Sequence, residues 1–316
     1  MNKRFTGYNG ILLLDKRQNI TSHQAVLEVR QIIRQRRVGH TGTLDPKAKG
    51  LIVVCIGRAT KIVQFVSDFD KTYEAEIFLG RTSSSYDSEG IIKDGMPKSA
   101  PDISLGKFQE ILNEFTGRKI QKVPAHSAIR VNGNRLYEFA RAGQEVELPV
   151  REIEIKSIEA VKYEKPILGF KVSCSKGTYI RSLASDIGER LECGAYLSNL
   201  NRTSVGNLVL KNALSIGEVE ELHSSGGLAE RLLSFDDVLN YSGILVTDEF
   251  RAQVLNGLDL RPSDVLGTLG EFAEGDRVLL KDQEGTPLAI GRAEVDSSRI
   301  KQVDSFKIFT YTRVLN

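Results

Sequence analysis

The chain is poor in the features that mark several large classes of protein. Its three cysteines are odd in number and scattered, which fits a reducing compartment, so we expect a cytoplasmic protein. Together with the four histidines they form no zinc-like spacing, and we expect no metal site. No apolar run approaches the roughly 18 residues of a membrane helix, and we expect neither a signal peptide nor a membrane partner.

Charge is nearly balanced over the whole chain but is distributed unevenly along it. The net charge is +2, yet residues 1–61 carry twelve Lys/Arg against three acids, a net of +9. The other 255 residues carry 31 Lys/Arg against 38 acids, a net of −7. Such asymmetry indicates a localised anion-binding face, and nucleic acid is the favoured partner. The alternative is that the basic residues lie on a solvated helix face.

Hydrophobic patterning predicts an α+β protein in which a mixed, largely antiparallel sheet has flanking helices. Residues 71–80 alternate with period two as a half-buried strand does, whereas residues 22–37 show helical spacing. From about Thr247 short strands dominate, so we divide the chain into domains 1–246 and 247–316, the second small and β-rich. Within the first, residues 118–151 form a basic excursion with little core of its own.

One short loop, residues 39–46, places a single carboxylate in a constrained setting. It reads GHTGTLDP, and it follows the arginines at positions 30, 34, 36 and 37. Pro46 disfavours helical geometry at Asp45, and the two glycines allow close backbone approach to a ligand. An acid held among arginines suggests chemistry on a polyanion, although an isolated Leu-Asp-Pro is more often a turn.

Several motifs in a fixed order closely resemble the bacterial tRNA pseudouridine synthase B family. The resemblance covers roughly residues 8–210, and the C-terminal unit looks more loosely like the family's PUA domain. The motifs are GHTGTLDP at 39–46, CIGRATK at 55–61, KTYEA at 71–75, LG at 79–80 with DSEG at 87–90, VNGNRLY at 131–137, and GTYIRSL at 177–183.

The resemblance implies isomerisation of a uridine in the T-loop of tRNA (conventional position 55) to pseudouridine. The glycosidic bond moves from N1 to C5 of the same base, with no cofactor or metal. The chain accordingly contains no P-loop and no Rossmann fingerprint. Because the target base is stacked in a folded loop, it must flip out before it reacts.

Three residues match the family's catalytic positions. Asp45 matches the catalytic aspartate, and the sequence leaves open whether it attacks sugar C1′, adds to C6 or abstracts the C2′ proton. Arg181 matches the arginine that pairs with this aspartate; without the resemblance it is an ordinary arginine at a helix start. Tyr73 matches the tyrosine that stacks on the displaced uracil, although its alternation alone indicates a half-buried strand residue.

Further matches imply a substrate-binding surface around these three residues. His40 matches the histidine that fills the space vacated by the flipped base. Lys61 and Asp87 match positions around the pocket, and each is otherwise a plain surface charge. Tyr179 and Leu200 match the lining of the uracil pocket. Arg202 contacts phosphate or anchors the loop, and the sequence does not separate these roles.

Two other functions compete with the stand-alone enzyme. The first is an RNA-binding folding factor that clamps the T-arm and elbow of tRNA, with modification incidental. The second is a guide-RNA-dependent relative, which the 118–151 excursion and the motif at 131–137 disfavour. We expect a monomer, because no unexplained apolar surface helix stands out.

Overall fold

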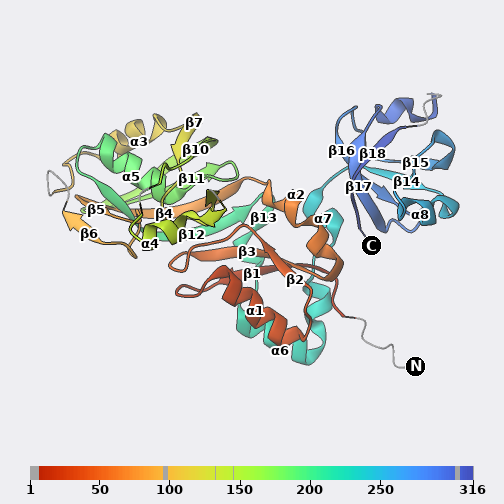
Figure 1. Ribbon diagram of the computed structural model, residues 1–316, viewed down its shortest axis with the longest axis horizontal. Coiled ribbons are helices and arrows are strands. Elements are labelled where there is room, and N and C mark those ends of the chain that lie inside the picture. Colours follow the sequence, from red (N-terminus) through yellow and green to blue (C-terminus); the bar gives the residue numbers. More distant parts are fainter. Residues whose placement is uncertain (1–6, 95–98, 132, 145, 303–306, 316) are drawn as a thin grey trace.

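The computed structural model describes residues 7–94, 99–131, 133–144, 146–302 and 307–315. Two units, each built around its own β-sheet, lie side by side along the long axis of the molecule (Figure 1). The larger unit contains the N-terminal strands and the helices that flank them, and the C-terminal unit is mainly strands. This arrangement confirms the predicted α+β class.

The larger sheet has nine strands and is antiparallel except for one pairing. Its main path runs β1-β3-β12-β4-β11-β10-β7, with β2 beside β3 and β13 beside β12. Among the described strands of this sheet, only β12 and β3 pair in parallel. The strands are β1 Gly10–Lys16, β2 Val38–Thr41, β3 Lys49–Ile56, β4 Lys71–Leu79, β7 Gly117–Lys122, β10 Val150–Glu164, β11 Ile167–Cys174, β12 Ala195–Val205 and β13 Leu208–Val209.

Helices pack against this sheet through apolar faces. The helices that pack on the sheet are α1 Ser22–Ile33, α2 Val63–Ser67, α3 Leu105–Asn113, α5 Ile180–Arg190, α6 Ile216–Ser225 and α7 Phe235–Leu239, and the same unit has 3₁₀ turns η1 Gly57–Ile62, η2 Leu210–Asn212 and η3 Gly227–Arg231. Helix α1 begins at a Thr21–Gln24 capping box. It was predicted to reach Arg37 but ends at Ile33, because Arg34 adopts a left-handed conformation with φ 51°.

Two segments are more regular than their sequence indicates. In the segment 81–94, which is rich in Ser, Asp and Gly, β5 Arg81–Ser83 and β6 Ile92–Asp94 pair as a hairpin. The excursion predicted at 118–151 begins with β7, which pairs with β10 at the edge of the large sheet. The remainder contains β8 Arg130–Val131, β9 Asn134–Arg135 and helix α4 Leu136–Arg141.

The C-terminal unit has a five-stranded sheet in the order β15-β14-β16-β17-β18. Its first strand, β14, lies N-terminal to the boundary drawn at residue 247, so the sheet of this unit begins earlier than that division. The elements are β14 Gly243–Val246, α8 Asp248–Val254, η4 Pro262–Asp264, β15 Val265–Leu269, β16 Arg277–Lys281, β17 Pro287–Ala293, η5 Ser297–Gln302 and β18 Phe309–Val314.

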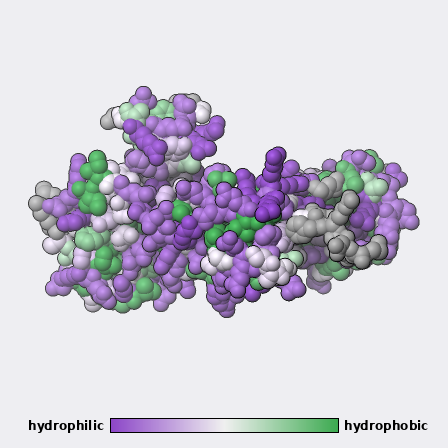
Figure 2. Space-filling model, turned by 90° about the horizontal axis from the view of Figure 1, so that it is seen from below, coloured by the Kyte–Doolittle hydropathy of each residue, from purple (hydrophilic) through white to green (hydrophobic). Residues whose placement is uncertain are grey.

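Apolar contacts connect the two units. Leu279, Ile290 and Leu315 of the C-terminal unit share one buried cluster with Ile11 and Val53 of the large sheet. The face of the molecule shown in Figure 2 is mainly hydrophilic, with small scattered apolar patches. Within the ranges that the structure describes, no helix has the length and apolar character needed to span a bilayer.

Candidate active site

A cleft of about 1080 Å³ brings together residues that are far apart in the sequence. Its walls come from the loop after β2, the strand β4, the loop 84–91, the segment 126–141, the start of α5, and β12. Most of the residues predicted to form the site line it: Asp45, Tyr73, Asp87, Tyr179, Arg181, Leu200 and Arg202. The cleft is therefore the candidate active site.

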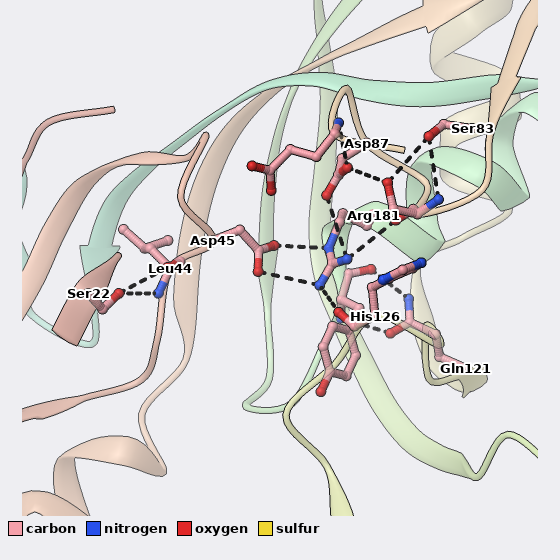
Figure 3. A network of polar contacts seen from close by, with 11 residues as sticks. Ser22, Leu44, Asp45, Ser83, Asp87, Gln121, His126 and Arg181 are labelled. Atoms are coloured by element: carbon pink, nitrogen blue, oxygen red, sulfur yellow. Dashed lines mark hydrogen bonds and ion pairs between the residues drawn. The ribbon is translucent and has the colours of Figure 1, made fainter. Parts of the chain in front are cut away.

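The loop that carries Asp45 is held by hydrogen bonds on both sides of the acid. The Leu44 N–H donates to Ser22 Oγ at 2.8 Å, and the Ser22 hydroxyl donates to the Leu44 carbonyl at 3.0 Å (Figure 3). On the other side, Lys16 Nζ donates to the Pro46 carbonyl at 3.2 Å, as does the Asn19 N–H at 2.8 Å. The acid thus projects from a backbone with little freedom.

Arg181 forms an ion pair with Asp45 and lies close to a second acid, Asp87. Its Nε lies 2.9 Å from Asp45 Oδ2, and its Nη2 donates to Oδ1 at 3.4 Å. Its Nη1 lies 3.6 Å from Asp87 Oδ2. The Arg181 side chain is only 7% exposed, whereas that of Asp45 is 39% exposed toward the cleft. The buried guanidinium therefore orients the carboxylate and leaves its exposed side open to a ligand in the cleft.

Neighbouring backbone groups fix the Arg181 guanidinium. It donates to the carbonyls of Ser85 at 3.3 Å and His126 at 3.0 Å. The Ser85 hydroxyl in turn donates to Asp87 at 2.5 Å. Sequence reasoning missed Ser85, because its role depends on a neighbour almost a hundred positions away in the chain.

The start of helix α5 is held by the strand β7. The Gln121 side chain is buried; its Oε1 accepts from the Tyr179 N–H at 2.8 Å, and its Nε2 donates to the Tyr179 carbonyl at 3.0 Å. Arg151 lies over the Tyr179 ring with its Cζ 5.6 Å from the centroid. Gln121 was not predicted to be a site residue, since nothing in its local sequence marks it.

Burial and the charge of Arg181 act in opposite directions on the pKa of Asp45. Desolvation raises the pKa of its carboxyl above the ordinary aspartate value, and the nearby Asp87 raises it further. The Arg181 guanidinium favours the ionised form and lowers the pKa. The net direction is upward, so Asp45 is more basic than a free aspartate.

Two adjacent strands place Tyr73 and Arg202 side by side. They are register partners on β4 and β12. Burial raises the pKa of the Tyr73 phenol, so its hydroxyl is protonated at neutral pH. Arg202 is 1% exposed and donates to the carbonyls of Leu51 at 2.7 Å and Gly42 at 3.0 Å. Arg202 therefore anchors the loop, one of the two roles that the sequence left open.

Two predicted residues lie outside the lining of the cleft. His40 is half-buried on β2, with Nε2 3.4 Å from Thr43 Oγ1, and burial lowers the pKa of its imidazole. Lys61 donates instead to the Val314 carbonyl of the C-terminal unit at 3.2 Å. The expectation that Lys61 lies around the pocket is not met, because η1 directs it toward the junction of the two units.

The arrangement combines a carboxylate, a protonated phenol and a guanidinium at one opening. A carboxylate can act as a nucleophile or a base without an activating partner, because its pKa lies below neutral pH unless burial raises it strongly. Among the described positions, no group of three or more His, Cys, Asp and Glu residues is placed to hold a metal ion.

Comparison with known proteins identifies the family. Residues 30–180 match the model of the TruB family pseudouridylate synthase N-terminal domain, and residues 243–314 match the PUA domain. The chain is 39% identical to tRNA pseudouridine synthase B of Bacillus subtilis strain 168, over 89% of this chain and 92% of the relative. For the Bacillus velezensis protein of the same name the identity is 43%, with the same coverage.

Solved structures share the fold. A Cbf5-Nop10-Gar1 complex contains a chain that superposes with a TM-score of 0.75 at 24% identity, covering 97% of this chain and 85% of that one. An H/ACA RNP bound to a substrate RNA gives a TM-score of 0.75 at 22% identity, covering 100% and 92%. On the strength of the sequence relatives, this chain is a member of the TruB family of pseudouridylate synthases.

Proposed function

We propose that this protein isomerises a uridine of tRNA to pseudouridine in the cleft around Asp45. The observation that carries the proposal is the ion pair between Asp45 and Arg181 at 2.9 Å, at the opening of a large cleft in a chain of this family. Its relatives are named tRNA pseudouridine synthase B, which supports tRNA as the substrate.

The target uridine is the one at the T-loop position that the family resemblance implies. The base flips into the cleft, where Asp45 acts as the catalytic group and the Tyr73 ring stacks on the uracil. Leu200 and Tyr179 provide the remaining walls of the uracil pocket, since both line the cleft. Flipping costs a few kcal/mol, which contacts inside the pocket offset.

Arg181 keeps Asp45 ionised and aimed as the RNA excludes water from the cleft. At an effective dielectric of 20, opposite charges about 4 Å apart attract by roughly 4 kcal/mol before desolvation. Asp87 holds the other side of the guanidinium. His40, in its neutral form, fills the space that the flipped base leaves in the RNA.

Basic residues outside the cleft bind the tRNA backbone. Residues 1–61 carry the +9 excess, and Lys61 lies near Arg37, Arg58 and Arg313 with its pKa lowered by burial and by these charges. We propose that Lys61 contributes to RNA binding at the junction of the two units. The protein works as a cytoplasmic monomer on the T-arm and elbow of tRNA.

The test is incubation of the purified chain with an unmodified tRNA transcript, followed by carbodiimide mapping of pseudouridine. The expected result is one modified uridine in the T-loop, without guide RNA, metal or nucleotide. A T-loop that stays unmodified while the tRNA is bound would refute the proposal. Conversion only after a guide RNA is added would favour the guide-dependent alternative.

The variant Asp45→Asn separates catalysis from a folding-factor role. It keeps the size of the side chain and removes its charge, so conversion is expected to fall by about 1,000-fold or more, as when a catalytic group is lost. Binding of tRNA, measured by filter retention, should remain. Wild-type rates of conversion in this variant would show that the acid is dispensable and would favour the folding factor.

A further inference from the structure

Two buried cations lie next to each other in the cleft wall, close to the Asp45 loop. Lys71 is 7% exposed and Arg202 is 1% exposed, and both line the cleft. A methyl group built on Gly42 would come 3.5 Å from Arg202 Nη1 and 4.0 Å from Lys71 Cε. The two side chains therefore meet at Gly42, which has a φ of +73°.

In the described part of the chain, the hydrogen bonds of these two cations go to uncharged groups. Lys71 Nζ donates to the carbonyl of Ser67 at 2.6 Å and to that of Phe69. Arg202 donates to the carbonyls of Leu51 and Gly42. An ammonium has three N–H donors, so these two carbonyls leave one Lys71 donor available to a ligand.

The nearest acids to Lys71 are already paired with other cations. Asp68 forms ion pairs with Lys176 at 2.6 Å and Arg277 at 3.5 Å. Asp70 forms an ion pair with Lys156. Within the described part of the chain, no carboxylate forms an ion pair with Lys71 or Arg202. Two adjacent buried cations without a carboxylate repel each other, and such charges are costly unless an anion joins them.

We infer that Lys71 and Arg202 form the floor of a phosphate subsite that binds a backbone phosphodiester of the tRNA beside the flipped uridine. The inference rests on the proposed function, because the polyanion that enters this cleft is the RNA substrate. The subsite adjoins the uracil pocket, because Arg202 is the register partner of Tyr73. In the described structure neither cation forms a hydrogen bond or an ion pair with Asp45.

The surroundings of this subsite suit a phosphate group. Ser67 and Thr178 line the same cleft, and Gly42 presents no side chain toward the two cations. A lysine binds phosphate as a compact point charge, and its third N–H can meet a phosphate oxygen. Arg202 adds a second positive charge beside Lys71, and the two carbonyls bound by its Nε and Nη2 leave its Nη1 for a ligand.

The test compares Lys71→Met and Lys71→Arg with the wild type in binding of an unmodified tRNA transcript over a range of salt. Removing one phosphate contact should weaken binding about tenfold and reduce the slope of log affinity against log salt by about 1. Lys71→Arg keeps the charge and should keep the slope. Lys156→Met is the matched control, since that exposed lysine pairs with Asp70.

A pH series provides a second readout. Burial, aided by Arg202, lowers the pKa of Lys71 to about 8, while Cys174, Asp68 and Asp70 act in the opposite direction. Because the ammonium form binds phosphate, affinity in the wild type should fall as pH rises through 8. Lys71→Arg stays charged over this range, so its affinity should fall less.

Each outcome bears on the inference. A Lys71→Met protein with a lower melting temperature but wild-type affinity and salt slope would show that Lys71 only braces the end of helix α2. If that variant fails to fold, a wild-type affinity that is constant from pH 7 to 9 overturns the inference. Wild-type conversion of uridine is measured in the same samples, so a failure of the proposed function is recognised separately.

Discussion

The two walls of the cleft are built in different ways. The acid wall, residues 42–46, is fixed by Lys16, Ser22 and Arg202, all of which are buried. The basic wall, residues 126–141, has helix α4, whose only buried residue in the described structure is Leu136. On this wall Arg141 lies over the Tyr137 ring with its Cζ 5.3 Å from the centroid.

This difference fits the roles proposed for the two walls. A catalytic carboxylate must be held within a fraction of an ångström of its productive position, which requires locked neighbours. A surface that grips a folded RNA can adjust as the RNA binds, so it needs fewer buried contacts. We therefore expect changes to the acid wall to affect rate and changes to the basic wall to affect affinity.

Among the residues that support Asp45, the largest effect is expected from Arg181→Met. Without the guanidinium, Asp45 loses its orientation, and misplacing a catalytic group by about 1 Å can cost about 100-fold in rate. Single-turnover conversion should fall by about that factor while tRNA affinity stays near the wild-type value. Arg190→Met is the control, because Arg190 lies on the same helix in an exposed ion pair with Glu114. A rate near that of the control would contradict the proposed role of Arg181.

The pH dependence of the rate sharpens the same prediction. The active form of Asp45 is the carboxylate, so the rate should fall as pH decreases through the raised pKa of this group. The acid limb of the pH–rate profile, where the rate falls with decreasing pH, should thus lie at higher pH than the titration of an ordinary aspartate. In Arg181→Met it should move to still higher pH, because Arg181 lowers this pKa. An acid limb that does not move would show that the guanidinium leaves Asp45 unaffected.

A smaller effect is expected from Ser22→Ala. The change removes both hydrogen bonds to the Leu44 backbone, and an unsatisfied buried group costs about 1–3 kcal/mol. Thermal unfolding should show this loss of stability. We expect the loosened loop also to raise the activation free energy by about 1.4 kcal/mol, which corresponds to a tenfold fall in saturating turnover. Ser215→Ala, which removes a helix cap on α6, should lower stability by about 1 kcal/mol and leave turnover unchanged. Equal turnover in both variants would argue against loop rigidity as a requirement.

The smallest effect is expected from Tyr137→Ala on the basic wall. The ring lines the cleft, where it can stack on a base of the RNA. Stacking on an aromatic side chain contributes about 1–3 kcal/mol per base, and the lower part of this range corresponds to a several-fold loss of affinity. Saturating turnover and the melting temperature should change little. A large loss of stability would show that this wall is as rigid as the other and would remove the contrast.

Much of the large sheet follows from the sequence, because alternation is a local signal. Strand β4 is a clear example: Tyr73, Ala75 and Ile77 are buried on one face. The end of α1 was predicted too late, because Arg34 takes a left-handed conformation without the glycine that usually marks it. The strands β14 and β15 were not predicted, since short strands that pair with distant partners carry little local pattern.

The candidate site likewise contains residues that the sequence indicates and residues that it does not. Motif matching placed Asp45, Tyr73 and Arg181 in one group, and the structure brings them into one cleft. It did not reveal Ser85 or Gln121, because their roles are hydrogen bonds to backbone groups that only the folded chain brings near. The family motifs thus indicate the reacting groups but not the residues that support them.

The strand β7 has a double duty. It forms the first part of the segment 118–151. Through the Gln121 side chain it also binds the backbone N–H and C=O of Tyr179, at the start of helix α5, which carries Arg181. RNA docked along that segment, where its basic residues are expected to face the substrate, would act through Gln121 on the position of the Arg181 guanidinium. In this proposal, substrate binding and the orientation of Asp45 are coupled through one glutamine.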